Sequence, residues 1–241
     1  LTKIFDVEEI SWNRCYEPWR IKRDKKIKEY FKKKTKVNSF NSLLLWEPWE
    51  VLKDDGAPYK VFTPYFKRGC LSKPQPREPK KTNLKIFDHN FKQTSLKDLK
   101  LIKNKKWEER ILKNWKISEV EAKNIMKSFF LNGLNDYTEG RNFPSMNNVS
   151  RLSPYIHWGQ ISVNTLWFNA KKINTITKNN SVEVFLSELG WREFAYYLLF
   201  HFPNLQTENL QDKFDRFPWD NNEKYYNAWI NGNTGYPIID A

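Results

Sequence analysis

The first forty residues carry a strand–helix–strand pattern, which restricts the folds open to this chain. The segment VEEISWN (7–13) has the composition of a strand, the lysine-rich run at 22–36 predicts a helix, and KVNSF (36–40) predicts a second strand. This order is typical of a parallel α/β unit. Because both faces of a parallel sheet must be covered, two such strands are not stable alone. We therefore expect residues 1–65 to be the C-terminal part of a larger α/β domain.

The rest of the chain predicts helices. The stretch LSKPQPREPKKTN (71–83) is rich in proline and charge, which indicates a linker or surface loop. We extend this predicted linker over residues 66–115. Ser118 and Glu121 then form a capping box, and Gly133 is placed to end the helix that this box begins. The apolar stripe of this helix consists of Ala122, Ile125, Met126, Phe129 and Phe130. Residues 116–241 are therefore expected to form an all-α domain.

Charge and cysteine content narrow the class of protein. The formal net charge is +13, which favours polyanionic partners and nucleic acid above all. The basic run at 22–36 is more simply interpreted as a solvated helix face, with Ile27 and Phe31 turned inward. Cys15 and Cys70 lie far apart without a partner motif, which argues against a disulfide scaffold and a zinc site and favours the cytoplasm. No run of 18 apolar residues is present, so we expect no membrane partner.

The stretch FLSELGWREFAYYLLF (185–200) predicts a long helix, because apolar residues recur at spacings of three and four. Within it, Glu188, Trp191 and Arg192 lie within one turn and are expected to share a face. Two interpretations are open. Taken alone, the stretch favours a Glu188–Arg192 surface pair beside a core tryptophan. The alternative is a functional site that uses all three side chains.

The segment VSRLSPY (149–155) predicts a helix that begins at Ser153, because proline is favoured in the first turn. A helix N-terminus presents unpaired N–H groups and a positive dipole end. With the hydroxyls of Ser150 and Ser153, these groups are suited to binding phosphate oxygens. An ordinary helix cap explains the same residues, and the local sequence favours it.

Several motifs occur together and in a fixed order. They are NRCYEPWRIKRDKKIK, LLLWEPWEVL, YKVFTPYFKRGC, YTEGRNFPSMNNVSRLSPYIHWG, FLSELGWREF, FPWDN and AWINGNTGYPIIDA. In this combination the chain resembles the photolyase/cryptochrome flavoprotein family, and within it the bacterial cyclobutane pyrimidine dimer photolyases. The resemblance covers nearly the whole chain, is weakest at residues 71–105, and is most specific at ELGWREF and TGYPIIDA.

The resemblance implies a domain organisation. Residues 1–65 match the C-terminal part of an α/β antenna domain with a parallel sheet, residues 66–115 an interdomain linker, and residues 116–241 the N-terminal part of the helical FAD- and DNA-binding domain. Family members continue on both sides of the matched region, and the chain begins with Leu1 rather than Met. We therefore expect a fragment truncated at both ends, inactive by itself, of a parent enzyme.

The resemblance also implies which residues contact damaged DNA. Glu188 matches a glutamate that hydrogen-bonds the damaged bases, and Trp191 matches a tryptophan that packs against the flipped-out dimer. Arg192 matches an arginine in the flavin and DNA-contact region, and Arg141 one that contacts a DNA phosphate. Extruding a lesion costs less than extruding a normal base pair, and an aromatic face then recovers about 1–3 kcal/mol of stacking per base.

The flavin residues follow from the same resemblance. Tyr137 matches a tyrosine that lines the flavin, and Phe185 a position where an aromatic residue lies against the cofactor. Trp219 matches the outermost tryptophan of the chain that photoreduces the flavin. The segment that holds the diphosphate is matched by Val149, Ser150, Arg151, Leu152 and Ser153.

Two departures from the family pattern concern cofactors. Val149 stands where the diphosphate motif usually has threonine, so one hydroxyl is lost, although backbone N–H groups can still bind. Trp19 and Arg20 occupy the places of an Asn–Glu pair found in members with a folate antenna. The expected cofactor is therefore FAD, with an unknown antenna chromophore that we do not expect to be folate.

The function implied is light-driven repair of pyrimidine dimers in DNA by electron transfer from reduced FAD. UV-damaged DNA is the expected partner of a monomeric protein. The alternative is a cryptochrome-type blue-light photoreceptor. A third hypothesis is a basic nucleic-acid-binding helical module without cofactor. Glu188 and Trp191 favour repair, because a photoreceptor needs no lesion clamp.

Overall fold

A computed structural model of the chain describes residues 7–81, 83, 95, 97–101 and 106–240. The remaining residues include much of the predicted linker, so that part of the prediction lies outside the described residues. The chain divides into two compact units, Leu1–His201 and Phe202–Ala241, and each is described by itself.

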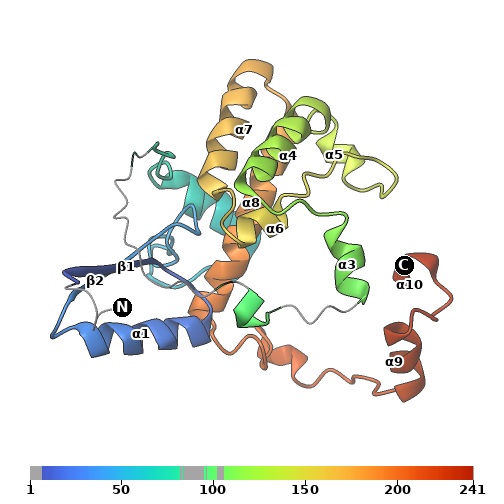
Figure 1. Ribbon diagram of the computed structural model, residues 1–241. Helices are drawn as coiled ribbons and strands as arrows, with labels where there is room; N and C mark the ends of the chain where they lie inside the picture. The colour runs from blue at the N-terminus through green and yellow to red at the C-terminus, as the bar shows by residue number, and fades with distance from the viewer. Residues whose placement is uncertain (1–6, 82, 84–94, 96, 102–105, 241) are drawn as a thin grey trace. The chain divides into compact units, whose positions relative to one another are not determined.

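Figure 1 shows the elements with their labels. The first unit contains β1 (Glu9–Asn13), α1 (Pro18–Phe31), β2 (Lys36–Phe40), α2 (Phe62–Pro64), the π-helical turn η1 (Tyr65–Gly69), the 3-10 turns η2 (Cys70–Ser72) and η3 (Lys97–Leu99), α3 (Lys106–Leu112), α4 (Glu119–Asn132), α5 (Tyr137–Gly140), α6 (Ser153–His157), α7 (Val163–Thr177) and α8 (Asn180–His201). The second unit contains the 3-10 turn η4 (Asp212–Phe214), α9 (Glu223–Ile230) and α10 (Pro237–Asp240).

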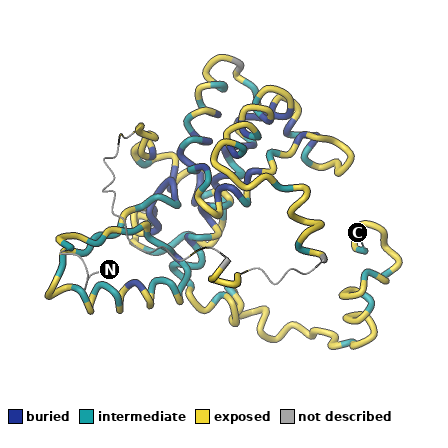
Figure 2. The backbone as a smooth tube through the Cα atoms, viewed as in Figure 1, coloured by how far each residue is buried: buried dark blue, intermediate teal, exposed yellow. Residues whose placement is uncertain are grey.

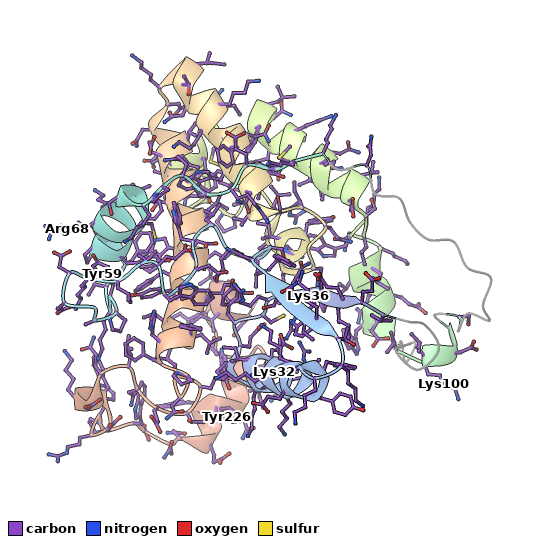
Figure 3. All side chains as sticks on the ribbon, turned by 90° about the vertical axis from the view of Figure 1, so that its left-hand side faces the viewer. Lys32, Lys36, Tyr59, Arg68, Lys100 and Tyr226 are labelled. Carbon is purple, nitrogen blue, oxygen red and sulfur yellow. The ribbon has the colours of Figure 1, made fainter. Side chains whose placement is uncertain are left out.

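The strand–helix–strand prediction is confirmed. β1 and β2 pair in parallel, from Glu9 opposite Lys36 to Asn13 opposite Phe40, and α1 connects them. Helix α1 begins at Pro18, four residues before the basic run, because proline is accommodated in the first turn of a helix. It ends at Phe31, so residues 32–35 of the run form a turn and not the predicted helix. Its basic side chains are largely solvated, and Figure 3 labels Lys32 just after the helix and Lys36 at the start of β2.

The helix caps form largely as the sequence predicts. Ser118 Oγ accepts a hydrogen bond of 3.0 Å from Glu121 N at the start of α4, and Gly133 follows its last residue. Ala122, Met126 and Phe129 of the predicted stripe are buried. Helix α6 begins at Ser153 as expected, but Leu152 takes the N-cap position without a side-chain cap.

Segments distant in sequence share one core in the first unit. Buried side chains from residues 44–70 pack with those of α4, α7 and α8, and Figure 2 shows the buried stretches of backbone where these elements meet. Trp46 meets Trp167 edge to face with ring centroids 5.3 Å apart. Residues 74–77, at the start of the predicted linker, are also held, because Pro74 O accepts from Trp46 Nε1 and Arg77 O accepts from Asn164 Nδ2.

Helix α8 is the longest described helix and contains the whole predicted 185–200 stretch. It contacts α5, α7 and η1. Because partners surround it on several sides, its buried residues do not form a single narrow stripe. Among the described residues, no helix combines the length and the apolar character required to cross a membrane.

Candidate functional site on helix α8 and the adjacent cleft

The three residues of the Glu188–Trp191–Arg192 turn do not share partners. Glu188 pairs with Arg141 at the C-terminal end of α5, Trp191 stacks on Phe62 of α2, and Arg192 binds Glu193 and the carbonyl oxygen of Leu43. The local expectation of a Glu188–Arg192 pair beside a core tryptophan is therefore wrong, although the three residues lie within one turn of the continuous helix α8. The reason is that the buried Glu193 attracts Arg192, which leaves Glu188 to a cation from another helix.

The Glu188–Arg141 pair brings three predicted site residues together. Arg141 Nη1 lies 2.5 Å from Glu188 Oε1, and the Arg141 guanidinium lies over the Tyr137 ring at 5.4 Å. The two charged side chains are 30% and 32% exposed, so water and ligands reach both. The hydrogen bond to Glu188 raises the pKa of Arg141, whose guanidinium is cationic at all relevant pH values in any case.

Trp191 lies at the surface with one face covered. Its ring is stacked on Phe62 with centroids 3.9 Å apart and planes inclined by 13°. The residue is 48% exposed, so it is neither fully solvated nor part of a closed core. An exposed indole with a fixed orientation is suited to stacking on a planar ligand such as a nucleobase.

Tyr137 and Phe185 lie inside the helical core. Both are buried, and their rings meet edge to face with centroids 5.7 Å apart. Each also contacts Phe129 of α4, at 5.5 Å and 5.2 Å between centroids. These contacts bring the two predicted flavin-lining residues together as part of the packing between α4, α5 and α8.

A separate open cleft of about 480 Å³ lies beside α4. Among the five residues of the predicted diphosphate segment, Val149, Ser150 and Arg151 line it, together with Lys113 and Lys116. Leu152 is instead buried, and Ser153 is exposed without being part of the lining. The structure thus brings three of the five segment residues into one cleft.

The chemistry of this cleft fits an anionic group. The side chains of Lys113, Lys116 and Arg151 give it three cations against the single carboxylate of Glu121. Ser150 Oγ accepts only a long hydrogen bond of 3.4 Å from Leu152 N, so its hydroxyl is available to a ligand. The volume is within the usual range of about 300–1,000 Å³ for ligand sites. The residues present therefore fit the diphosphate of a flavin dinucleotide.

Trp219 belongs to the second unit. It is 72% exposed and contacts Phe217, with ring centroids 4.7 Å apart. In the same unit, the TGYPIIDA segment is closed by Asp240, which accepts hydrogen bonds from Thr234 Oγ1 at 2.6 Å and Gly235 N at 2.9 Å. The exposure of Trp219 agrees with its predicted place at the solvent end of an electron-transfer chain, and that role stays a prediction.

Known protein families match both the N-terminal and the C-terminal part of the chain. Residues 1–82 match the family model of DNA photolyase, and residues 185–241 match that of the FAD binding domain of DNA photolyase. A deoxyribodipyrimidine photo-lyase of Agrobacterium fabrum is 36% identical over 240 residues, which cover 97% of this chain and 50% of the relative. The chain belongs to the photolyase/cryptochrome family.

A plant cryptochrome and a solved bacterial photolyase structure are also similar to this photolyase-family chain. Cryptochrome-1 of Arabidopsis thaliana is 29% identical and matches 100% of the chain and 37% of its own length. The crystal structure of a bacterial class III photolyase from Agrobacterium tumefaciens has a TM-score of 0.87 at 34% identity, covering 99% of this chain and 50% of its own. The chain thus spans about half the length of the photolyases that it matches, and the predicted family resemblance and fold class are confirmed.

Sequence reasoning missed several residues of this photolyase-family site. Phe62 and Phe66 support Trp191, and Gly190 leaves the space that the Phe66 ring occupies. Glu193 is fully buried and accepts a hydrogen bond of 2.6 Å from Leu45 N. Burial raises the pKa of Glu193 to about 7, although Arg192 and two backbone amides favour the charged form. The sequence feature that could have indicated this role of Glu193 is the presence of a carboxylate within a mostly apolar helix.

The antenna departure is also visible in the structure. Trp19 is exposed, and the guanidinium groups of Arg20 and Arg23 lie 5.1 Å and 5.5 Å from its ring centroid. Trp19 and Arg20 are the two residues at the expected places of the Asn–Glu pair, and the absence of a folate antenna stays a prediction.

Proposed function

We propose that the complete gene product is a DNA photolyase that uses reduced FAD and light to split pyrimidine dimers. The observation that carries this proposal is the arrangement on one turn of α8, where a half-exposed indole backed by Phe62 lies three residues from a carboxylate paired with Arg141. When bound and excited by light, reduced FAD would supply one electron to the dimer and take it back after the cyclobutane bonds have broken, so the reaction would have no net redox change.

The residues of this chain then have separate tasks. Trp191 stacks on the extruded dimer and replaces stacking that the duplex has lost. Arg141 is placed to exchange Glu188 for a DNA phosphate, since both side chains are reached by water. Glu188 is thereby released to accept hydrogen bonds from base N–H groups. The pairing with Arg141 holds both groups ready in the absence of DNA.

The cleft at residues 149–151 is proposed to hold the FAD diphosphate. Ser150 donates from its hydroxyl, and Arg151, Lys113 and Lys116 balance the negative charge. Val149 contributes no hydroxyl, so the backbone N–H groups of this turn carry a larger share of the binding. The match of residues 185–241 to an FAD-binding domain supports FAD as the cofactor, and the cationic lining of the cleft supports this place for its diphosphate.

A cryptochrome-type photoreceptor is the alternative, supported by the likeness to cryptochrome-1 of Arabidopsis thaliana. A photoreceptor does not need an exposed stacking surface beside an ion pair, so the α8 arrangement favours repair. We also propose a monomeric protein of the cytoplasm, for which the free cysteines Cys15 and Cys70 are suitable.

The test uses the complete gene product, purified with its flavin and chemically reduced. An oligothymidylate that contains cyclobutane dimers is illuminated with it, and thymine absorbance is followed. We expect recovery of thymine in the light and none in the dark, and a matched oligonucleotide with (6-4) products should stay unchanged. A product that binds flavin but leaves dimers intact in the light would support the photoreceptor alternative.

A further inference from the structure

Trp191 is the outermost member of a stack of three aromatic rings. Phe62 lies against it with centroids 3.9 Å apart, and Phe66 lies behind Phe62 at 5.5 Å with the planes only 12° apart. Phe194 contacts both Trp191 and Phe62 edge to face. Exposure decreases along the stack, because Trp191 is half-exposed, Phe62 is partly buried and Phe66 is buried. One face of Trp191 is therefore occupied by protein.

Gly190 fixes the inner end of this stack. A Cβ atom at this position would lie 2.5 Å from Phe66 Cε2 and 2.6 Å from Phe66 Cδ2, closer than any real contact. Phe66 therefore rests directly on the backbone of α8, one residue before Trp191. Only glycine permits this approach, so Gly190 sets the distance between α8 and the segment that carries Phe62.

The segment that carries Phe62 and Phe66 is anchored at both ends. Tyr59 N donates a hydrogen bond of 2.9 Å to Tyr197 Oη of α8, and a Cβ on Gly69 would lie 2.7 Å from Val51 Cγ1. Figure 3 labels Tyr59 before the α2–η1 turns and Arg68 at their end, beside α8. Phe62 is thus held by a fixed piece of backbone.

The geometry points to Phe62 as a positioning residue for lesion binding, with Gly190 and Phe66 as its support. This inference rests on the proposed function, in which Trp191 stacks on the dimer. Phe62 covers the inner face of the indole and restricts its rotation, so that the outer face is presented to a base without further ordering. Preorganisation of this kind increases affinity because less conformational freedom is lost on binding.

The decisive variant is Phe62→Leu in the complete gene product. Leucine retains apolar volume but has no flat face to stack on, so the dissociation constant for dimer-containing DNA should rise about 3- to 10-fold, the value of one aromatic pair. Affinity for undamaged DNA and repair per photon at saturating substrate should change less than twofold. Phe62→Tyr keeps the ring and should restore the affinity. Phe40→Leu, at an exposed phenylalanine of β2, is the matched control.

A second readout follows the indole itself. The protein is labelled with 5-fluorotryptophan, and the Trp191 resonance is assigned by its loss in Trp191→Phe. Phe62→Leu should move this resonance and narrow it, because the ring current disappears and the indole becomes mobile. Gly190→Ala should move it as well, because Phe66 is displaced, and a folded Gly190→Ala protein should weaken dimer binding in the same direction.

The measurements distinguish failure of the proposed function from failure of the positioning role of Phe62. If the unmodified protein does not prefer dimer-containing DNA, the proposed function fails. If it does, and Trp191→Ala loses the preference while Phe62→Leu keeps it with an unchanged Trp191 resonance, only the positioning role of Phe62 is overturned.

Discussion

Two carboxylate–guanidinium pairs lie close together on helix α8, and their surroundings differ. Glu188 and Arg141 are 2.5 Å apart and about one-third exposed. Glu193 and Arg192 are 2.9 Å apart, but Glu193 is completely buried and Arg192 is 19% exposed. The first pair joins α8 to α5, whereas the second joins α8 to the segment at residues 43–46.

The difference shows how similar pairs serve different purposes. An exposed ion pair contributes little to stability, so its partners can exchange for a ligand at low cost. In a buried pair each charge needs the other, and removal of one leaves an uncompensated charge. Even so, Arg192 Nη2 is buried without a hydrogen-bond partner among the described residues. We interpret the first pair as ready for DNA and the second as structural.

Removal of the buried carboxylate of Glu193 should destabilise the protein more than any change to the Glu188–Arg141 pair. Glu193→Ala takes the acceptor away from Arg192 and from the N–H of Leu45, so the free energy of unfolding should fall by about 3–5 kcal/mol. Urea unfolding of the complete gene product at pH 7 measures this. Glu188→Ala is the matched control and should cost less than about 1 kcal/mol. Equal losses from the two variants would remove the distinction between the pairs.

The stability of the folded protein should also depend on pH through Glu193. The folded-state pKa of Glu193 is raised from 4.5 to about 7, so the stabilising contribution of its neutral form is complete below pH 4.5 and is lost as pH rises through 7. The loss should reach about 3 kcal/mol. We expect the difference in unfolding free energy between the unmodified protein and Glu193→Gln to fall over this window. A constant difference would mean that burial does not control this carboxyl group.

Much of the fold could be predicted from sequence because its signals are local. The strands predicted at 7–13 and 36–40 and the N-cap at Ser118 depend on neighbouring residues, and the structure confirms both strands, the first at 9–13, and the hydrogen bond from Glu121 N to Ser118 Oγ. The family was also within reach, since its motifs are contiguous.

Partner choice on α8 could not be predicted in the same way. Glu193 and Leu45 are separated by 148 positions, and Phe62 lies far from Trp191 in the chain. Spacing alone permits Glu188 to pair with Arg192. In the structure Arg192 pairs with the buried Glu193 instead, and Glu188 pairs with Arg141. The partner of a charged side chain on a central helix depends on which side chains are buried beside it in the fold. A single sequence does not contain that information directly.

Changes to the partly exposed Glu188–Arg141 pair should affect stability least. Arg141→Gln and Glu188→Gln should each change the free energy of unfolding by less than about 1 kcal/mol, because water replaces the lost partner. Their double-mutant coupling should be similarly small and should shrink further as salt is raised from 0.05 M to 0.5 M, as screening of exposed charges requires. Dimer repair is the contrasting readout, since both variants remove groups proposed to contact DNA. Full repair activity in both would leave the pair without a function, and a coupling above about 3 kcal/mol would make it structural like Glu193 and Arg192.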